Sequence, residues 1–138
     1  MTKHILVLFT LLSLTLISLA SKATERPTIS QSQLQSLIDS QSPKIFTLLD
    51  VRSADEFNAG HINTAINISH KSLQGDLLTE SLAKLPTNKS QLIVTYCRSG
   101  RRAGIAEQIL RDAGYTNVQH LAGDMNAWSD ASLPVEIE

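Results

Sequence analysis

Residues 92–96 form an apolar run, LIVTY, whose composition predicts a buried β-strand. A helical pattern follows, because apolar side chains recur at i, i+3, i+4 and i+7 from Ala106 to Ala113. Between the two lies Cys97, the only cysteine of the 138-residue chain. The chain must therefore turn tightly at Cys97, from the end of a strand into the N-terminus of a helix.

This turn favours a reactive sulfur. Backbone N–H groups at a helix N-terminus are unpaired, and the helix dipole places partial positive charge there. Arg98, Arg101 and Arg102 add three full positive charges within five residues of Cys97. Both effects favour the thiolate, which is the nucleophilic form. A single cysteine after a strand is often only a small buried apolar side chain. Such a structural role does not require positively charged neighbours, which are present here.

The rest of the chain alternates between strand and helix patterns. Residues 45–51 form a second, almost wholly apolar run, as expected of a strand covered on both faces. Shorter strands are predicted at residues 28–30, 65–68 and 117–121. Two helices are predicted after capping boxes, one formed by Ser30 and Gln33 and the other by Ser53 and Glu56. Three more are predicted at residues 79–85, from the Cys97 loop to residue 113, and at residues 124–128. A turn is predicted at Ser42-Pro43.

This alternation predicts an α/β fold: a single domain with a parallel sheet flanked by helices on both faces. Ligands bind such sheets at the carboxyl ends of the strands, where Asp50 and Cys97 both fall. One cysteine and scattered histidines give no metal-ligand spacing, and we expect neither a metal nor a cofactor.

The first 23 residues have the pattern of a secretory signal peptide, with Lys3 followed by an uncharged run dominated by Leu and Ile. Small residues allow cleavage after Ala23 or, as a second choice, after Ala20. The apolar run is short for a membrane span, so an uncleaved anchor is the less favoured alternative. We therefore expect a domain at residues 24–138 that is exported, to the periplasm of a Gram-negative bacterium or to the medium, and is not itself bound to a membrane.

Charge and cysteine content restrict the partners of this domain. Removal of residues 1–23 leaves ten basic and thirteen acidic residues, a formal net charge of −3, which gives no indication of nucleic-acid binding. A lone cysteine cannot form an internal disulfide. An unpaired thiol in an oxidising compartment is more consistent with a functional side chain than with a structural one. We expect the domain to act as a monomer.

Three motifs resemble those of rhodanese-like domains. The first is residues 49–52, LDVR, followed by Glu56-Phe57 and Gly60-His61-Ile62. The second is YCRSGRRA at residues 96–103, and the third runs from Gly114-Tyr115 to Ala122-Gly123 and Trp128. The resemblance covers roughly residues 28–134. Within the family, the sequence most resembles exported single-domain sulfurtransferases of bacteria. The sequence departs from the family pattern at Ser69, where a proline is common, and at Ala122, where a glycine is common.

The resemblance implies transfer of a sulfane sulfur from a donor such as thiosulfate to Cys97, which becomes a persulfide. A thiophilic acceptor, such as cyanide, a small thiol or a thiol-containing protein, then takes the sulfur. In this interpretation Cys97 is the catalytic nucleophile. The substrate-binding residues are those of the following loop: Arg98, Ser99, Gly100, Arg101 and Arg102. Their backbone amides would cradle the persulfide, and Arg102 is the expected contact for an anionic donor.

Several polar residues near the motifs have structural rather than catalytic interpretations. Asp50 and Arg52 are expected to form a partly buried pair that fixes the loop beside the Cys97 turn. We expect Glu56 to be a helix cap and His61 to be a hydrogen-bonded turn residue. The remaining expectations are ordinary polar positions at His70 and His120 and a core position at Trp128.

Two other functions remain as alternatives. Cysteine phosphatases and arsenate reductases also place a cysteine at the start of an anion-binding loop, but their loops resemble Cys-x5-Arg, whereas here the sixth residue after Cys97 is Ala103. The second alternative is a non-catalytic rhodanese-like module that binds a partner, which is the natural reading when the cysteine is replaced. Because the cysteine is present, a sulfurtransferase is the favoured function.

Overall fold

The computed structural model describes residues 25–40 and 45–138. The predicted signal peptide and the predicted turn at Ser42-Pro43 lie outside these residues, and so remain predictions. Within the described part of the chain, no helix is both long and apolar enough to cross a membrane.

Five parallel strands form one sheet in the order β1-β5-β4-β2-β3. The two apolar runs form the neighbouring central strands β2 and β4, which pair from Phe46 opposite Leu92 to Asp50 opposite Tyr96. The strands are β1 (Thr28–Ile29), β2 (Phe46–Asp50), β3 (Ile66–Asn67), β4 (Leu92–Tyr96) and β5 (Val118–Leu121). The register places the ends of β2 and β4 side by side, so that Asp50 and Cys97 lie at the same edge of the sheet.

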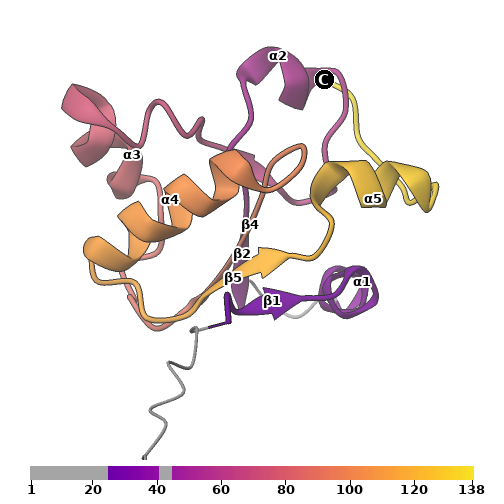
Figure 1. The fold of residues 1–138 in the computed structure, drawn as a ribbon, viewed down its shortest axis with the longest axis horizontal. Helices are drawn as coiled ribbons and strands as arrows, with labels where there is room; N and C mark the ends of the chain where they lie inside the picture. The colour runs from indigo at the N-terminus through magenta and orange to yellow at the C-terminus, as the bar shows by residue number, and fades with distance from the viewer. Residues whose placement is uncertain (1–24, 41–44) are drawn as a thin grey trace, which may run out of the picture.

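Helices cover both faces of this sheet, which confirms the predicted α/β fold. In Figure 1, α3 and α4 lie on one side of the strands, and α1 and α5 lie on the other. The helices are α1 (Gln31–Asp39), α2 (Ala54–Asn58), α3 (Leu78–Ala83), α4 (Arg101–Asp112) and α5 (Asp124–Asp130). The prediction for α3 was wrong by one residue at its start and two at its end. A 3-10 turn, Gly75–Leu77, precedes it, and Pro86 disfavours helical backbone at the residue before it.

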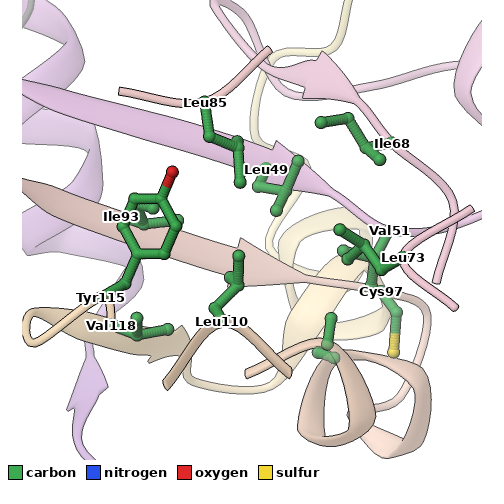
Figure 2. Packing of buried hydrophobic residues seen from close by; sticks show 12 residues of the cluster. Leu49, Val51, Ile68, Leu73, Leu85, Ile93, Cys97, Leu110, Tyr115 and Val118 are labelled. Atoms are coloured by element: carbon green, nitrogen blue, oxygen red, sulfur yellow. The ribbon is translucent and has the colours of Figure 1, made fainter. Parts of the chain in front are cut away.

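The alternation of side chains along the central strands divides the core into two halves. Leu49 and Ile93 point toward α3 and α4, where they pack with Leu110 of α4. This half also contains Cys97 and is drawn in Figure 2. Leu48 and Val94 point the other way, into a second cluster with residues of α1 and α5. Because each helix layer buries one face of β2 and β4, the end of β4 is buried on both faces.

Candidate active site

Cys97 is the first residue after β4, and only 1% of it is exposed. Its side chain lies at the end of the apolar half of the core that packs against α4. Figure 2 shows the sulfur beyond the end of the strand, with Val51 and Leu73 beside it. The sulfur is therefore placed at the carboxyl end of the central strand, as the sequence predicted.

The loop after Cys97 directs a backbone donor at the sulfur. Gly100 has φ 104°, a left-handed conformation that side-chain-bearing residues rarely adopt. This bend allows the Gly100 N–H to donate a hydrogen bond to Cys97 Sγ over 3.0 Å, immediately before α4 begins at Arg101. A Cβ at Gly100 would also lie 3.1 Å from Asp124 Oδ2. Glycine is thus required both by the backbone and by the space around it.

The three arginines of the loop have different surroundings. Arg98 and Arg101 are exposed, as is Ser99. Arg102 instead forms a bidentate ion pair with Glu56, with Nη1–Oε2 at 2.6 Å and Nη2–Oε1 at 2.9 Å. These bonds lower the pKa of Glu56 to about 2. They also raise the pKa of Arg102, to which its hydrogen bond and charge interaction with Cys97 contribute further.

A network of four charged side chains, of which all but Arg26 are buried, holds the backbone of the Cys97 loop. Asp124 Oδ1 accepts a hydrogen bond from the Cys97 N–H at 2.9 Å, and Asp124 Oδ2 lies 2.9 Å from His120 Nε2. His120 Nδ1 lies 3.0 Å from Glu107 Oε1, which also accepts from Thr95 Oγ1 at 2.6 Å. Arg26 completes the buried network (Arg26, Glu107, His120 and Asp124) with bonds to both oxygens of Glu107 at 2.6 and 2.7 Å.

The contacts within the buried network favour the charged forms of His120 and Glu107. Burial disfavours a positive charge on His120, but hydrogen bonds to Asp124 and Glu107 outweigh it and raise the pKa of His120 to about 9. Burial likewise opposes the charge of Glu107, and the donors His120, Arg26 and Thr95 lower its pKa to about 2. A positive charge on His120 therefore faces a negative charge on Glu107 directly behind the loop.

The expectation of an ordinary polar position at His120 was wrong. His120 is 6% exposed and joins the two buried carboxylates of the network. Glu107 and Asp124 were not identified from the sequence at all, although one signal was present for Glu107. It lies four residues after Ala103 and three before Leu110, on the buried face of α4. A charged residue at such a position needs a buried partner.

Asp50 and Arg52 form the predicted pair, which is buried rather than partly buried. Asp50 is 0% and Arg52 6% exposed, and Arg52 Nη2 lies 2.6 Å from Asp50 Oδ2. Arg52 Nη2 also donates to the carbonyl of Gly60 at 2.8 Å. The pair therefore connects the end of β2 to the segment after α2. Glu56 lies in α2 itself.

Three further expectations are confirmed by the contacts. Glu56 caps α2 through a reciprocal capping box with Ser53, and it also binds Arg102, a contact that the sequence did not predict. His61 is hydrogen-bonded as expected, with Nδ1 3.0 Å from the carbonyl oxygen of Phe57 and its ring stacked on that of Phe57, but it lies in an isolated antiparallel bridge with Glu136 rather than in a turn. Trp128 is 1% exposed and belongs to the core cluster beneath α1 and α5.

A pocket of about 370 Å³ adjoins the Cys97 loop. Residues 53–54 at the start of α2 and residues 67–72, from the last residue of β3 onward, form two of its walls. The others are formed by Ser81 and Lys84 from the α3 segment and by Arg102. His70, expected to be an ordinary polar residue, and Ser69, the departure from the family pattern, both line this pocket.

Comparison with known proteins identifies the family of this chain. The Rhodanese-like domain family matches residues 30–131, most of the described chain. The chain belongs to the rhodanese-like domain family. It is 34% identical over 109 residues to the human thiosulfate:glutathione sulfurtransferase, a match that covers 74% of this chain and 92% of that protein. The predicted general class, a domain related to sulfurtransferases, is thereby confirmed.

Further relatives show the extent of the rhodanese-like domain. The chain is 34% identical over 116 residues to an uncharacterized protein of Synechocystis, covering 84% of this chain but 59% of that longer protein. Among solved structures, a rhodanese-related protein from Thermoplasma volcanium is 27% identical with a TM-score of 0.65, and the match covers 81% of this chain and 99% of that one. Some relatives therefore extend well beyond the part that this chain matches.

The loop of this rhodanese-like domain differs in a specific way from a loop that encloses a tetrahedral oxyanion. The sixth residue after Cys97 is Ala103, which is 0% exposed and packs in the core on the inner face of α4. No side chain at that position can close a ring of donors around a phosphate. Among residues 25–40 and 45–138, no group of three or more His, Cys, Asp or Glu side chains could hold a metal ion.

Proposed function

We propose that this rhodanese-like domain is a sulfurtransferase that moves a sulfane sulfur from thiosulfate, or a similar anionic donor, to a thiophilic acceptor through a persulfide on Cys97. The observation that supports it most is the hydrogen bond from the Gly100 N–H to Cys97 Sγ, at the positive N-terminus of α4. A sulfur held in this way, with Arg102 beside it, is arranged to carry negative charge.

The first half-reaction loads the enzyme. The Cys97 thiolate attacks the outer sulfur of thiosulfate, a new S–S bond forms, and the S–S bond of the donor breaks. Sulfite leaves with the electron pair of that bond, so no external oxidant or reductant is required. Arg98 and Arg101, which are exposed at the loop, would attract the doubly charged donor, and the loop amides would stabilise the charge on the terminal sulfur.

The second half-reaction returns the enzyme to its starting state. A nucleophilic acceptor attacks the terminal sulfur of the persulfide, and the Cys97 thiolate leaves. The Gly100 N–H, 3.0 Å from Sγ in the unloaded protein, is positioned to stabilise this leaving group. The name of the human relative, thiosulfate:glutathione sulfurtransferase, supports a thiol as the acceptor, which would be a small molecule or a protein.

The test is an intact-mass measurement of the protein after incubation with thiosulfate, beside a Cys97→Ser variant. We expect a gain of one sulfur atom in the wild type and none in the variant. Addition of cyanide should remove that sulfur and release thiocyanate. Absence of any sulfur uptake would contradict thiosulfate as donor, and a non-catalytic module that binds a partner would then be the better interpretation.

We also propose that the domain works outside the cytoplasm as a monomer, without metal or cofactor. The support for export is the signal-peptide pattern of residues 1–23. Expression of the full sequence in a bacterium, followed by fractionation and N-terminal sequencing of the soluble product, tests it. A product that stays in the cytoplasmic fraction would contradict export, and an exported product that keeps Met1 would contradict cleavage.

A further inference from the structure

The N-terminal turn of α5 binds the Cys97 loop through its backbone. The Met125 N–H donates to the carbonyl oxygen of Cys97 at 3.0 Å, and the Asn126 N–H donates to that of Arg98 at 3.1 Å. N–H groups in the first turn of a helix have no partner inside the helix, so these two can bind another segment. Asp124, the first residue of α5, accepts from the Cys97 N–H through its side chain. One short helix therefore holds two consecutive carbonyl groups of the loop.

Two left-handed residues direct α5 toward the loop. Gly123 has φ 77° and Asp124 has φ 55°, so the chain turns sharply between β5 and α5. A Cβ at Gly123 would clash with the Cβ of Ala127, so this position requires glycine. Aspartate is one of the few other residues that adopt a left-handed conformation readily. The approach of α5 to the loop is thus set by its local sequence.

The held carbonyls determine where the next two N–H groups point. A trans peptide group is planar, and its C=O and N–H point in opposite directions; no peptide bond in the described part of the chain is cis. Because the carbonyls of Cys97 and Arg98 point toward α5, the N–H groups of Arg98 and Ser99 point away from it. Neither N–H group has a hydrogen-bond partner among residues 25–40 and 45–138.

The direction away from α5 leads to the face of the sheet that carries the sulfur. Met125 and Trp128 of α5 belong to one half of the core, whereas Cys97 belongs to the other half, beneath α3 and α4. Figure 1 shows α4 and α5 on opposite sides of the strands. The Arg98 and Ser99 N–H groups therefore open toward the side on which a sulfur bound to Cys97 would lie.

We propose that the N-terminal turn of α5 is a positioning element for sulfur transfer: by holding two carbonyls of the loop, it presents the Arg98 and Ser99 N–H groups to the terminal sulfur of the Cys97 persulfide. This inference rests on the proposed function, because the persulfide is the intermediate of that reaction. The Cys97 and Gly100 N–H groups already have acceptors, Asp124 Oδ1 and Cys97 Sγ. The two unpaired N–H groups gain theirs when sulfur arrives.

The covalent step is the one given above. The bond between Cys97 Sγ and the transferred sulfur forms, the S–S bond of thiosulfate breaks, and sulfite leaves with its electron pair. The transferred sulfur carries the negative charge, and donors that are already oriented stabilise it without reorganisation. The turn of α5 therefore favours the loaded state over the unloaded state.

Asn126→Pro tests this role by removing a single N–H donor. The Asn126 side chain is exposed and forms no hydrogen bond within the described residues. Proline is tolerated in the first turn of a helix, where no intrahelical bond is lost. Asn126→Ala is the matched control, because it removes the same side chain and keeps the N–H. We expect the equilibrium constant for sulfur loading to fall about tenfold in Asn126→Pro and to stay at the wild-type value in Asn126→Ala.

Intact mass gives the loaded fraction at several ratios of thiosulfate to sulfite, and urea unfolding gives the stability of each variant. A purely structural role for α5 would lower the free energy of unfolding and leave the loading equilibrium of the folded protein unchanged. Equal loading constants in Asn126→Pro and Asn126→Ala would therefore overturn the proposal.

Amide proton resonances of the wild type provide a second measurement, which also decides the matter if Asn126→Pro does not fold. Polysulfide loads the protein chemically: the Cys97 thiolate attacks a terminal sulfur, the adjacent S–S bond breaks, and the shortened polysulfide leaves with the electron pair. On loading, the Arg98 and Ser99 amide protons should move downfield as they gain a charged acceptor. Those of Met125 and Asn126 should stay in place. Unmoved Arg98 and Ser99 resonances would overturn the proposal.

The two measurements separate this inference from the proposed function. Absence of sulfur uptake from thiosulfate, with the downfield shifts present after polysulfide loading, would contradict only the proposed donor. Normal uptake in the wild type, with equal loading constants in the two Asn126 variants, would contradict only the role of α5.

Discussion

Two sets of charged side chains hold the Cys97 loop, and they differ in their exposure to solvent. The Glu107, His120 and Asp124 side chains of the buried network are 1%, 8% and 3% exposed, and only its outer member, Arg26, is 35% exposed. In the Glu56–Arg102 pair the side chains are 32% and 20% exposed. The buried network binds the backbone of Cys97, whereas the pair places a cation beside its sulfur.

This difference in burial separates two tasks. Loss of one partner in a buried ion pair leaves an uncompensated charge in a medium of low polarisability, and is costly. Loss of one partner in a solvated ion pair lowers the free energy of unfolding only slightly, because water replaces the missing partner. We infer that the buried network fixes the loop geometry, while the Glu56–Arg102 pair can rearrange when an anionic substrate arrives. The predictions below test this distinction.

Asp124→Asn should have the largest effect. The side chain keeps its size and can still accept from the Cys97 N–H, but the negative charge facing His120 is lost. The free energy of unfolding should fall by about 3 kcal/mol at neutral pH, and the rate of sulfur loading from thiosulfate by about tenfold. Urea unfolding and a time course of intact mass measure the two effects.

Asp112→Asn is the control for that variant. Asp112 is exposed at the end of α4 and bonds only Gln108 among the contacts found, so its loss should change stability by less than about 0.5 kcal/mol. A destabilised Asp124→Asn protein whose folded fraction loads sulfur at the wild-type rate would show that the buried network supports stability but does not position the loop.

Local sequence patterns were sufficient to predict the fold and the position of Cys97. The two central strands follow from continuous apolar runs, and the turn at Cys97 follows from the abrupt change to a helical pattern. Where local signals are weaker the prediction was less accurate, as at α3, which lacks a side-chain cap at its start. These parts of the structure depend on residues that are close in the sequence.

The buried network could not be predicted in the same way. Its four members come from the segment before β1, from α4, from β5 and from α5, and only the packed sheet brings them together. His120 shares a face of β5 with Val118, and strand alternation alone would have placed it inward. The sequence did not indicate which carboxylates it meets there.

His120→Gln should have the next largest effect, visible in the pH dependence. The pKa of His120 is raised to about 9 from an unfolded value near 6.5. Its contribution to stability is therefore fully present below about pH 6.5 and is lost as the pH rises through about 9. The wild type should lose on the order of 2 kcal/mol of unfolding free energy between these values through this group, and the variant should not.

Urea unfolding at several pH values, on both proteins, gives the difference curve that isolates His120. His61→Gln is a suitable control, because it removes a buried histidine outside the network and should leave the slope above pH 6.5 in place. Parallel wild-type and His120→Gln curves from pH 6.5 to 9 would contradict a charged His120 in the folded protein.

Glu56→Gln should have the smallest effect, because the Glu56–Arg102 pair is partly solvated. The pKa of Glu56, lowered to about 2, means that its contribution is present above about pH 4.5 and is lost as the pH falls toward 2. At neutral pH the variant should lose no more than about 1 kcal/mol, and less in 1 M salt, whereas the loss in Asp124→Asn should be nearly independent of salt. Released from its carboxylate, Arg102 should bind the donor more tightly and lower the KM for thiosulfate about twofold. A large, salt-independent loss of stability in Glu56→Gln would instead assign the exposed pair the same structural task as the buried network.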